Sequence, residues 1–174
     1  MKNIVATLSL LFATTLSAQV AIGKATVSSP AVSLEFYDNA DNTRGIILPW
    51  VTSTAAVTGA VNGTIVYNTA DRKVYVKYAS GWRDLSVDNT GTVTTTLQDS
   101  LTDQDTAKVL IGGDPATDTT PGILVLADTN KAMVLPKVAS PHLNIVNPSP
   151  GMIVYDTTKK QLAVFNGTVW SFWK

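Results

Sequence analysis

One twenty-residue stretch occurs twice in this chain, and this repetition constrains the fold more than any other feature of the sequence. GTIVYNTADRKVYVKYASGW spans residues 63–82, and GMIVYDTTKKQLAVFNGTVW spans residues 151–170. The two stretches align without a gap. The positions that carry the same residue in both are Gly63/Gly151, Ile65/Ile153, Val66/Val154, Tyr67/Tyr155, Thr69/Thr157, Val76/Val164 and Trp82/Trp170. Self-similarity at a fixed spacing predicts one structural unit that is used more than once.

The similarity extends beyond the quoted stretches. VAIG at residues 20–23 corresponds to VLIG at residues 109–112. GIILPWV at residues 45–51 corresponds to AMVLPKV at residues 132–138, with the prolines in register. We therefore predict three segments after the N-terminus: a repeat unit at residues 19–86, a linker rich in Thr and Asp at residues 87–108, and a second repeat unit at residues 109–174.

Both copies have the pattern of short strands separated by turns. Val74 and Val76 alternate with Tyr75 and Lys77, which is typical of a strand with two different faces. The Asn-Gly pair at residues 166–167 indicates a tight hairpin. Val and Thr are abundant, as in strands, and Glu occurs once. We therefore predict an all-β fold, with two tandem copies of a small, sandwich-like β-meander unit joined by the linker.

The first residues have the layout of a secretory signal peptide. Lys2 precedes an apolar run at residues 4–13, and small residues continue to Ala18. We predict a signal peptide at residues 1–18 that is removed before Gln19. The alternative is an N-terminal membrane anchor, although a spanning helix needs about 20 apolar residues. We expect an exported protein in the periplasm, at the outer-membrane surface or outside the cell, without a transmembrane segment.

The charge and the absence of cysteine exclude several functions. Without cysteine, the chain cannot form disulfides, bind metal through thiolates or carry the acyl chain of a bacterial lipoprotein. The whole chain has 13 basic and 13 acidic residues. Removal of Lys2 with the signal peptide leaves 12 basic against 13 acidic residues, a net charge of −1. Because no basic field exists, we expect no nucleic-acid partner.

Residues for catalysis are scarce. The single histidine, His142, follows Pro141 in an expected loop, and no Gly-x-Ser-x-Gly motif accompanies it. Most acidic residues stand beside Gly, Asn, Thr or Lys in expected turns, and they offer no pair of carboxylates across a cleft. No glycine-rich phosphate loop is present. We predict that the protein is not an enzyme and has no catalytic residue, cofactor or metal site.

The repetition separates residues that the fold requires from residues that serve a particular task. Trp50 aligns with a lysine, and Tyr75, which strand alternation points outward, aligns with an alanine. Exposed aromatic rings provide contact area for proteins or sugars at low entropic cost. The candidate contacts with a partner protein or a glycan are Trp50, Tyr75, Lys77 and Trp173. The alternative is that an interface between units or between subunits buries these side chains.

The small size of each unit predicts association. A unit of about 65 residues without disulfides or metal has a marginal core. Either the two units pack on each other, or several chains pack together, and open strand edges favour association in both cases. We therefore expect self-association or a protein partner.

The order AQVAIG, GIILP, GTIVYNT and GW in the first copy resembles a repeat of secreted Bacteroidota surface proteins. In those proteins a mature start like QVGIGT precedes a GVLLPR-like strand and a GMLVYNT…NGTSW meander. A similar meander occurs in bacteriophage tail-fibre and knob regions. The chain departs from this pattern at Lys24 and at Gly113-Asp114, where the relatives carry Thr, and at Trp50, where Arg is common. The resemblance covers nearly all of both units.

The resemblance implies a structural or adhesive role and, by analogy with phage fibres, a homotrimer. We therefore predict a non-catalytic secreted or cell-surface protein, a fibre- or adhesin-like component. Two alternatives remain open. One is an accessory or cargo subunit docked on an outer-membrane secretion or gliding assembly of Bacteroidota. The other is a carbohydrate-binding module or an enzyme with an unrecognised site.

The resemblance also implies a modification, since secreted Bacteroidota proteins carry O-linked sugars at Asp-Ser/Thr followed by an apolar residue or Thr. Four stretches fit this pattern, and their acceptor residues are Ser100, Thr106, Thr119 and Thr157. In a chain rich in Thr and Asp, such triplets also arise by chance. Both interpretations stay open from the sequence.

Overall fold

The computed structural model describes residues 19–102, 104 and 106–174, so the predicted signal peptide at residues 1–18 lies outside the described residues. Within them the chain forms fourteen short strands, one 3-10 turn, η1 (Thr54–Ala56), and one turn of α-helix, α2 (Pro141–Asn144). The predicted all-β fold is confirmed. Over this part of the chain, no helix has the length and apolar character that crossing a membrane requires.

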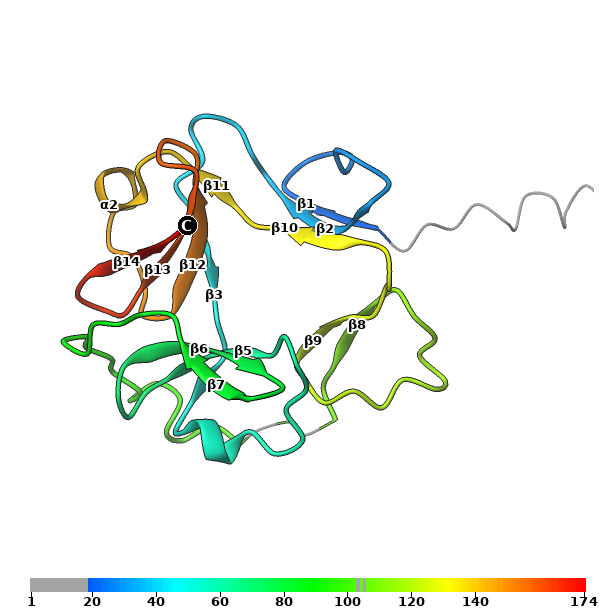
Figure 1. Ribbon diagram of the computed structural model, residues 1–174, viewed down its shortest axis with the longest axis horizontal. Helices are drawn as coiled ribbons and strands as arrows, with labels where there is room; N and C mark the ends of the chain where they lie inside the picture. Colours follow the sequence, from blue (N-terminus) through cyan, green and yellow to red (C-terminus); the bar gives the residue numbers. More distant parts are fainter. Residues whose placement is uncertain (1–18, 103, 105) are drawn as a thin grey trace, which may run out of the picture.

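Each repeated stretch forms a three-stranded antiparallel meander with a short parallel strand beside it (Figure 1). In spatial order, the first sheet contains β4 (Trp50–Val51), β5 (Ile65–Asn68), β6 (Lys73–Tyr78) and β7 (Gly81–Asp84). The second contains β11 (Lys137–Val138), β12 (Met152–Asp156), β13 (Gln161–Phe165) and β14 (Trp170–Trp173). The repeated sequence therefore builds the same strand order twice.

The two meanders pair in equivalent registers. The corresponding cross-strand pairs are Ile65/Val76 and Ile153/Val164, then Lys77/Trp82 and Phe165/Trp170. Because side chains alternate between the two faces of a strand, an equal register places corresponding residues on corresponding faces of both sheets. The predicted unit boundaries near residues 86 and 109 stay a prediction.

Each half of the chain begins with a pair of parallel strands. In the first half β1 (Val20–Ile22) pairs with β2 (Val32–Phe36), and in the second half β8 (Val109–Ile111) pairs with β9 (Leu124–Leu126). The corresponding pairs are Val20/Leu34 and Val109/Leu124. Gly23 and Gly112 end the first strand of each pair with φ values of 77° and 76°. This conformation costs glycine little, which explains why both copies carry it.

Two strands with related sequences connect the halves in different ways. β3 (Ile46–Ile47), from GIILP, pairs antiparallel with β12 of the second half. β10 (Ala132–Val134), from AMVLP, pairs parallel with β2 of the first half. In Figure 1 the cyan β3 lies beside the orange β12, and the yellow β10 lies beside the blue β2. Each half therefore contributes a strand to a sheet of the other half.

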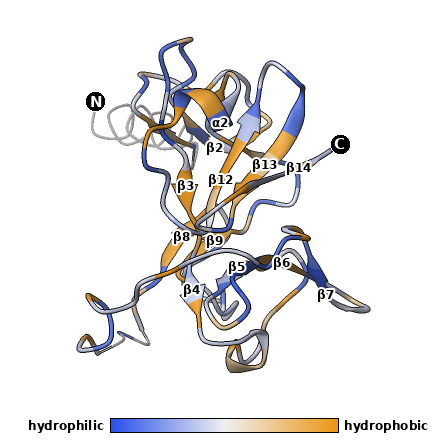
Figure 2. Cartoon of the chain, turned by 90° about the vertical axis from the view of Figure 1, so that its left-hand side faces the viewer, coloured by the Kyte–Doolittle hydropathy of each residue, from blue (hydrophilic) through white to orange (hydrophobic). Residues whose placement is uncertain are grey.

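The two meanders share a hydrophobic core. Its buried members come from both halves and are Leu48, Tyr67, Val74, Leu85, Ile153 and Val164. A second cluster lies on the other face of the second meander and contains Val138, Ile145, Met152, Val154, Ala163 and Phe165. The second meander is therefore covered by apolar residues on both faces, and Figure 2 shows the hydrophobic colouring of β12 and β13.

The beginning of the predicted linker packs against the hairpin turn of the second meander. Asn166 Nδ2 donates a hydrogen bond of 3.0 Å to Asp88 Oδ1, and Thr168 Oγ1 donates one of 3.0 Å to the Thr90 carbonyl oxygen. Gly91 passes so close that a Cβ atom there would lie 2.1 Å from the Asn166 carbonyl oxygen. Polar and backbone contacts therefore hold this segment, although it has no apolar periodicity.

Candidate interaction surface

Trp50, in β4, joins the two halves of the chain. Its indole Nε1 donates a hydrogen bond of 3.0 Å to the Pro150 carbonyl oxygen. Its ring centroid lies 6.1 Å from that of Tyr67. The side chain is partly buried, as expected for an amphipathic ring with a satisfied N–H group. Trp50 therefore contributes to the contact between the halves.

Tyr75 and Lys77 lie in β6, on the face that turns away from the shared core. The Tyr75 hydroxyl donates a hydrogen bond of 2.6 Å to Asp71 Oδ2. Burial raises the pKa of Tyr75, and the bond to Asp71 raises it further. Lys77 Nζ donates a hydrogen bond of 3.0 Å to the Tyr78 carbonyl oxygen. Both side chains are partly buried and bound to their own hairpin, so Tyr75 points outward less freely than alternation predicts.

Trp173, at the end of β14, packs against the first meander. Its Nε1 donates a hydrogen bond to the Leu85 carbonyl oxygen. The Arg83 guanidinium carbon lies 5.1 Å from the centroid of the Trp173 ring, within the range of a cation–π contact. Trp50 and Trp173 both border the shared core, whereas the two β6 candidates lie on the other face of that strand. The structure therefore does not gather the four predicted contact residues into one patch.

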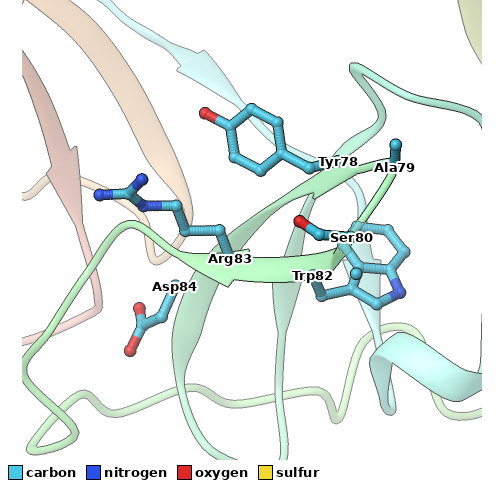
Figure 3. A pocket seen from close by; sticks show the side chains of 7 residues that line it. Tyr78, Ala79, Ser80, Trp82, Arg83 and Asp84 are labelled. Carbon is cyan, nitrogen blue, oxygen red and sulfur yellow. The ribbon is translucent and has the colours of Figure 1, made fainter.

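A shallow hollow lies over the β6–β7 hairpin (Figure 3). Its lining is one continuous piece of chain, residues 78–84. Tyr78 and Arg83 extend to one side of the hairpin, and Trp82 and Asp84 extend to the other. Because a single hairpin cannot surround a ligand, the hollow lacks the enclosing, largely apolar walls of a small-molecule site.

His142 lies in α2 and not in the loop that the sequence predicts. Pro141 fits the first position of a helix, where its missing N–H group costs nothing, and it starts this turn. The exposed His142 ring meets the Phe172 ring edge-on, with centroids 5.8 Å apart. Across residues 19–102, 104 and 106–174, no three His, Cys, Asp or Glu side chains gather closely enough to hold a metal ion.

Lys24 belongs to an ion-pair network with Glu35, the single glutamate of the chain. Lys24 Nζ lies 2.9 Å from Glu35 Oε1 and 3.2 Å from Asp38 Oδ1. Lys137 Nζ of the second half lies 3.3 Å from Asp38 Oδ2. The network therefore ties the second half to the end of β2. The signals that identify it in the sequence are the unusual lysine and the lone glutamate.

The network shifts the pKa values of Lys24, Glu35 and Asp38. The hydrogen bond to Glu35 raises the pKa of Lys24, against the opposing effect of burial. Burial acts to raise the pKa of the fully buried Glu35, but hydrogen bonds from the Ser28 N–H and from Lys24 together lower it below 4.5. Hydrogen bonds from Lys24 and Lys137 lower the pKa of Asp38. Lys24, Glu35 and Asp38 are therefore charged at neutral pH.

Apolar side chains are exposed at the β8–β9 pair: Val109 is 57% exposed, Ile123 66% and Leu124 46%. Among the described residues β9 pairs with β8 alone, so its second edge has no strand beside it. A two-stranded sheet is marginally stable in water, and an uncovered edge favours pairing with another chain. This open edge of β9 is the feature of the structure best suited to a contact between molecules. The sequence predicts open strand edges without indicating where they lie, and the structure has one at β9.

The four predicted O-glycosylation acceptors are exposed at the surface. They are Ser100, Thr106, Thr119 and Thr157. Asp105, which belongs to the pattern at Thr106, lies outside the described residues. Exposure makes all four hydroxyl groups accessible to a modifying enzyme.

Residues 114–173 match the model of a known family, described as a phage tail like trimerisation region. The matched segment is about a third of the chain and contains β9 to β14. No curated protein and no solved structure matches the chain. The second half is therefore similar to a structural trimerisation region of phage tail-like proteins, in agreement with the predicted resemblance to phage tail fibres.

Proposed function

We propose that this protein is a non-catalytic structural component, fibre- or adhesin-like, that works through self-association as a homotrimer. The observation that carries the proposal is the similarity of residues 114–173 to a trimerisation region. The second meander is already covered on both faces within the chain. Association between copies is therefore expected to use strand edges, and the open edge of β9 lies within the matched segment.

The mass of the protein in solution tests this proposal. Size-exclusion chromatography with light scattering is expected to give one species at three times the mass of a single chain. The full-length chain has a mass of 18.5 kDa, which removal of the signal peptide reduces. A clean monomer over a range of protein concentrations would contradict the proposal.

We also propose that the protein is exported and is one of the secreted surface proteins of Bacteroidota. The support is the signal-peptide layout of residues 1–18 and the resemblance of both copies to the repeat of those proteins. N-terminal analysis of protein from native cells is expected to find Gln19 first, and retention of residues 1–18 would contradict export with cleavage. Co-purification of outer-membrane proteins would instead favour the docked secretion or gliding subunit.

O-glycosylation at Ser100, Thr106, Thr119 and Thr157 is a separate proposal. It is supported by the exposure of all four side chains. Intact-mass measurement of protein from native cells is expected to exceed the sequence mass by whole sugar residues. An unmodified native protein would contradict this proposal and leave self-association unaffected.

A further inference from the structure

β3 and β10 correspond in sequence, but they pair with their neighbouring strands through opposite edges. β3 pairs with β12 through one edge, and β10 pairs with β2 through the other. Directly after β3, the Leu48 N–H donates a hydrogen bond of 3.0 Å to the Gly151 carbonyl oxygen. Backbone groups alternate in direction along a strand. The N–H and C=O groups of Ile46 and Leu48 therefore face β12, and those of Ile47 face the opposite edge.

β10 uses the edge that β3 leaves open. The Ala132 N–H donates a hydrogen bond of 2.9 Å to the Ala31 carbonyl oxygen, so the backbone groups of Ala132 and Val134 face β2. Val134 corresponds to Ile47 in the aligned sequences, and Ile47 is 51% exposed. The free edge of β3 therefore corresponds to the edge through which β10 pairs with β2.

β9 presents the edge that β2 uses to receive this strand. β2 has β1 on one side and β10 on the other, whereas its counterpart β9 has only β8 among the described residues. The Ala127 N–H donates a hydrogen bond of 2.9 Å to the Ile111 carbonyl oxygen of β8. By alternation, the backbone groups of Leu124 and Leu126 face the open edge of β9. Each protein molecule thus carries both a strand with a free edge, β3, and a strand with a matching open edge, β9, and these two strands do not pair with each other among its described residues.

A contact between a glycine and a tyrosine is likewise formed by only one of two corresponding pairs of residues. A Cβ atom at Gly151 would lie 2.8 Å from Tyr67 Cβ, whereas a Cβ atom at Gly63 would meet nothing within 4 Å. Tyr67 is fully buried, and its counterpart Tyr155 is 37% exposed. The contact between Gly151 and Tyr67 therefore has no counterpart inside the described chain. The two residues that would form it, Gly63 and Tyr155, are both open.

We propose that β3 of one copy pairs with the open edge of β9 in a second copy, parallel and in the register that β10 adopts on β2. In that register Ile47 lies opposite Val125, as Val134 lies opposite Glu35 within the chain. The occupant is a second copy because the strand and the edge that fit each other both belong to this chain. Pairing covers the exposed apolar side chains of β9 and satisfies its open backbone groups.

By analogy with the contact between Gly151 and Tyr67 within the chain, Gly63 of one molecule would lie against Tyr155 of a neighbouring molecule. The inference rests on the proposed self-association and specifies the surfaces that produce it. It replaces a marginal two-stranded sheet by one of at least three strands in each subunit.

Engineered disulfides test the register, because the chain has no cysteine of its own. Full-length Ile47→Cys and Val125→Cys chains are refolded together and oxidised under mild conditions, and linked peptides are identified by mass spectrometry. Directly paired residues of neighbouring strands lie about 5 Å apart, within reach of a disulfide. The control mixes Ile47→Cys with Ile123→Cys, two residues out of register and about 8 Å away.

We expect the Ile47–Val125 disulfide to form between chains at least tenfold faster than the control pair. A wild-type monomer in light scattering would overturn both the proposed function and this inference. A wild-type oligomer without the Ile47–Val125 linkage, or with equal linkage in the control, would overturn the inference alone.

Proline substitutions give a second test that does not depend on oxidation. Leu124→Pro removes an N–H group from the open edge of β9 without removing one from its pairing with β8. Leu110→Pro is the matched control, because Leu110 directs its N–H group to the outer edge of β8. We expect Leu124→Pro to weaken self-association at least tenfold and Leu110→Pro to leave it unchanged, with circular dichroism showing that both variants fold. Equal association of the two folded variants would overturn the inference.

Discussion

The two meanders of this chain share their strand order and register but differ in what surrounds them. The first meander contributes one face to the shared core, whereas the second has apolar clusters on both faces. Tyr67 and Tyr155 occupy corresponding positions, yet Tyr67 is fully buried and Tyr155 is 37% exposed. The burial of a repeated residue is therefore set by the element that packs against its sheet and not by the meander itself.

The largest difference is expected when each tyrosine is truncated. Tyr67→Ala removes a fully buried ring and should lower the free energy of unfolding by about 4 kcal/mol, whereas Tyr155→Ala should cost about 1 kcal/mol. Urea unfolding at low protein concentration, followed by tryptophan fluorescence, measures both. Equal costs would show that the two tyrosines are equally well packed, against the difference in burial.

The two meanders also differ at the glycines that precede β5 and β12. Gly63 and Gly151 have φ values of 90° and 77°, so alanine introduces conformational strain of about 1 kcal/mol at both positions. Only at Gly151 does the added Cβ atom also collide with the Tyr67 side chain. We expect Gly151→Ala to cost about 3 kcal/mol and Gly63→Ala about 1 kcal/mol in urea unfolding. A Gly63→Ala variant as unstable as Gly151→Ala would contradict this.

Removal of one hydroxyl group tests the polar part of the same contact. The Tyr67 hydroxyl donates a hydrogen bond of 2.7 Å to the Asn166 carbonyl oxygen, so Tyr67→Phe should cost about 1 kcal/mol. Burial raises the pKa of Tyr67 to about 12 from 10.0. Because the folded state favours the neutral ring, this contribution is complete below pH 10 and is lost as the pH rises from 10 to about 12.

Urea unfolding of wild type and Tyr67→Phe between pH 9 and 12 measures this loss. We expect the difference between the two proteins to shrink as the pH rises above 10. Tyr155→Phe serves as the matched control and should change stability little at neutral pH. A constant difference between wild type and Tyr67→Phe would contradict the assignment.

The smallest expected effect compares the two parallel strand pairs. Glu35 and Asp38, at the end of the first pair, have lowered pKa values because of their partners, so they stabilise the fold above their unfolded pKa values of 4.5 and 3.8. This contribution is lost as the pH falls through their folded pKa values. We expect Glu35→Gln to flatten the decline of stability below about pH 4.5. Asp118→Asn, in the second half, is the comparison variant and should flatten it less, since Asp118 is less buried than Glu35.

The strands and turns of both meanders were predictable because their signals are local. Alternating side chains fix the faces of β6, and the Asn-Gly pair fixes the turn before β14. A repeated register then follows from a repeated pattern. The candidate contacts were less predictable, since alternation places Tyr75 on a face but cannot show that its hydroxyl binds Asp71.

The exchange of β3 and β10 was not predictable, because the two sequences look alike and each strand has two edges. Which edge is used depends on long-range geometry that no local pattern contains. The packing of the first residues of the linker against the second meander was not predictable for a related reason. Its contacts with the turn at Asn166 involve hydrogen bonds and the close approach of Gly91, and these leave no periodic apolar trace.

The exchanged strand β10 also has a consequence for the order of synthesis. Val32 of β2 pairs with Ala132 of β10, which is synthesised about a hundred residues later, so the β1–β2–β10 sheet cannot be complete before then. Neither half, produced by itself, contains the strand that finishes it. A nascent molecule therefore exposes the edge of β2 that pairs with β10 for as long as its last third is missing. Contacts of such long sequence separation also slow folding, so shielding the growing polypeptide from neighbouring copies matters most before translation ends.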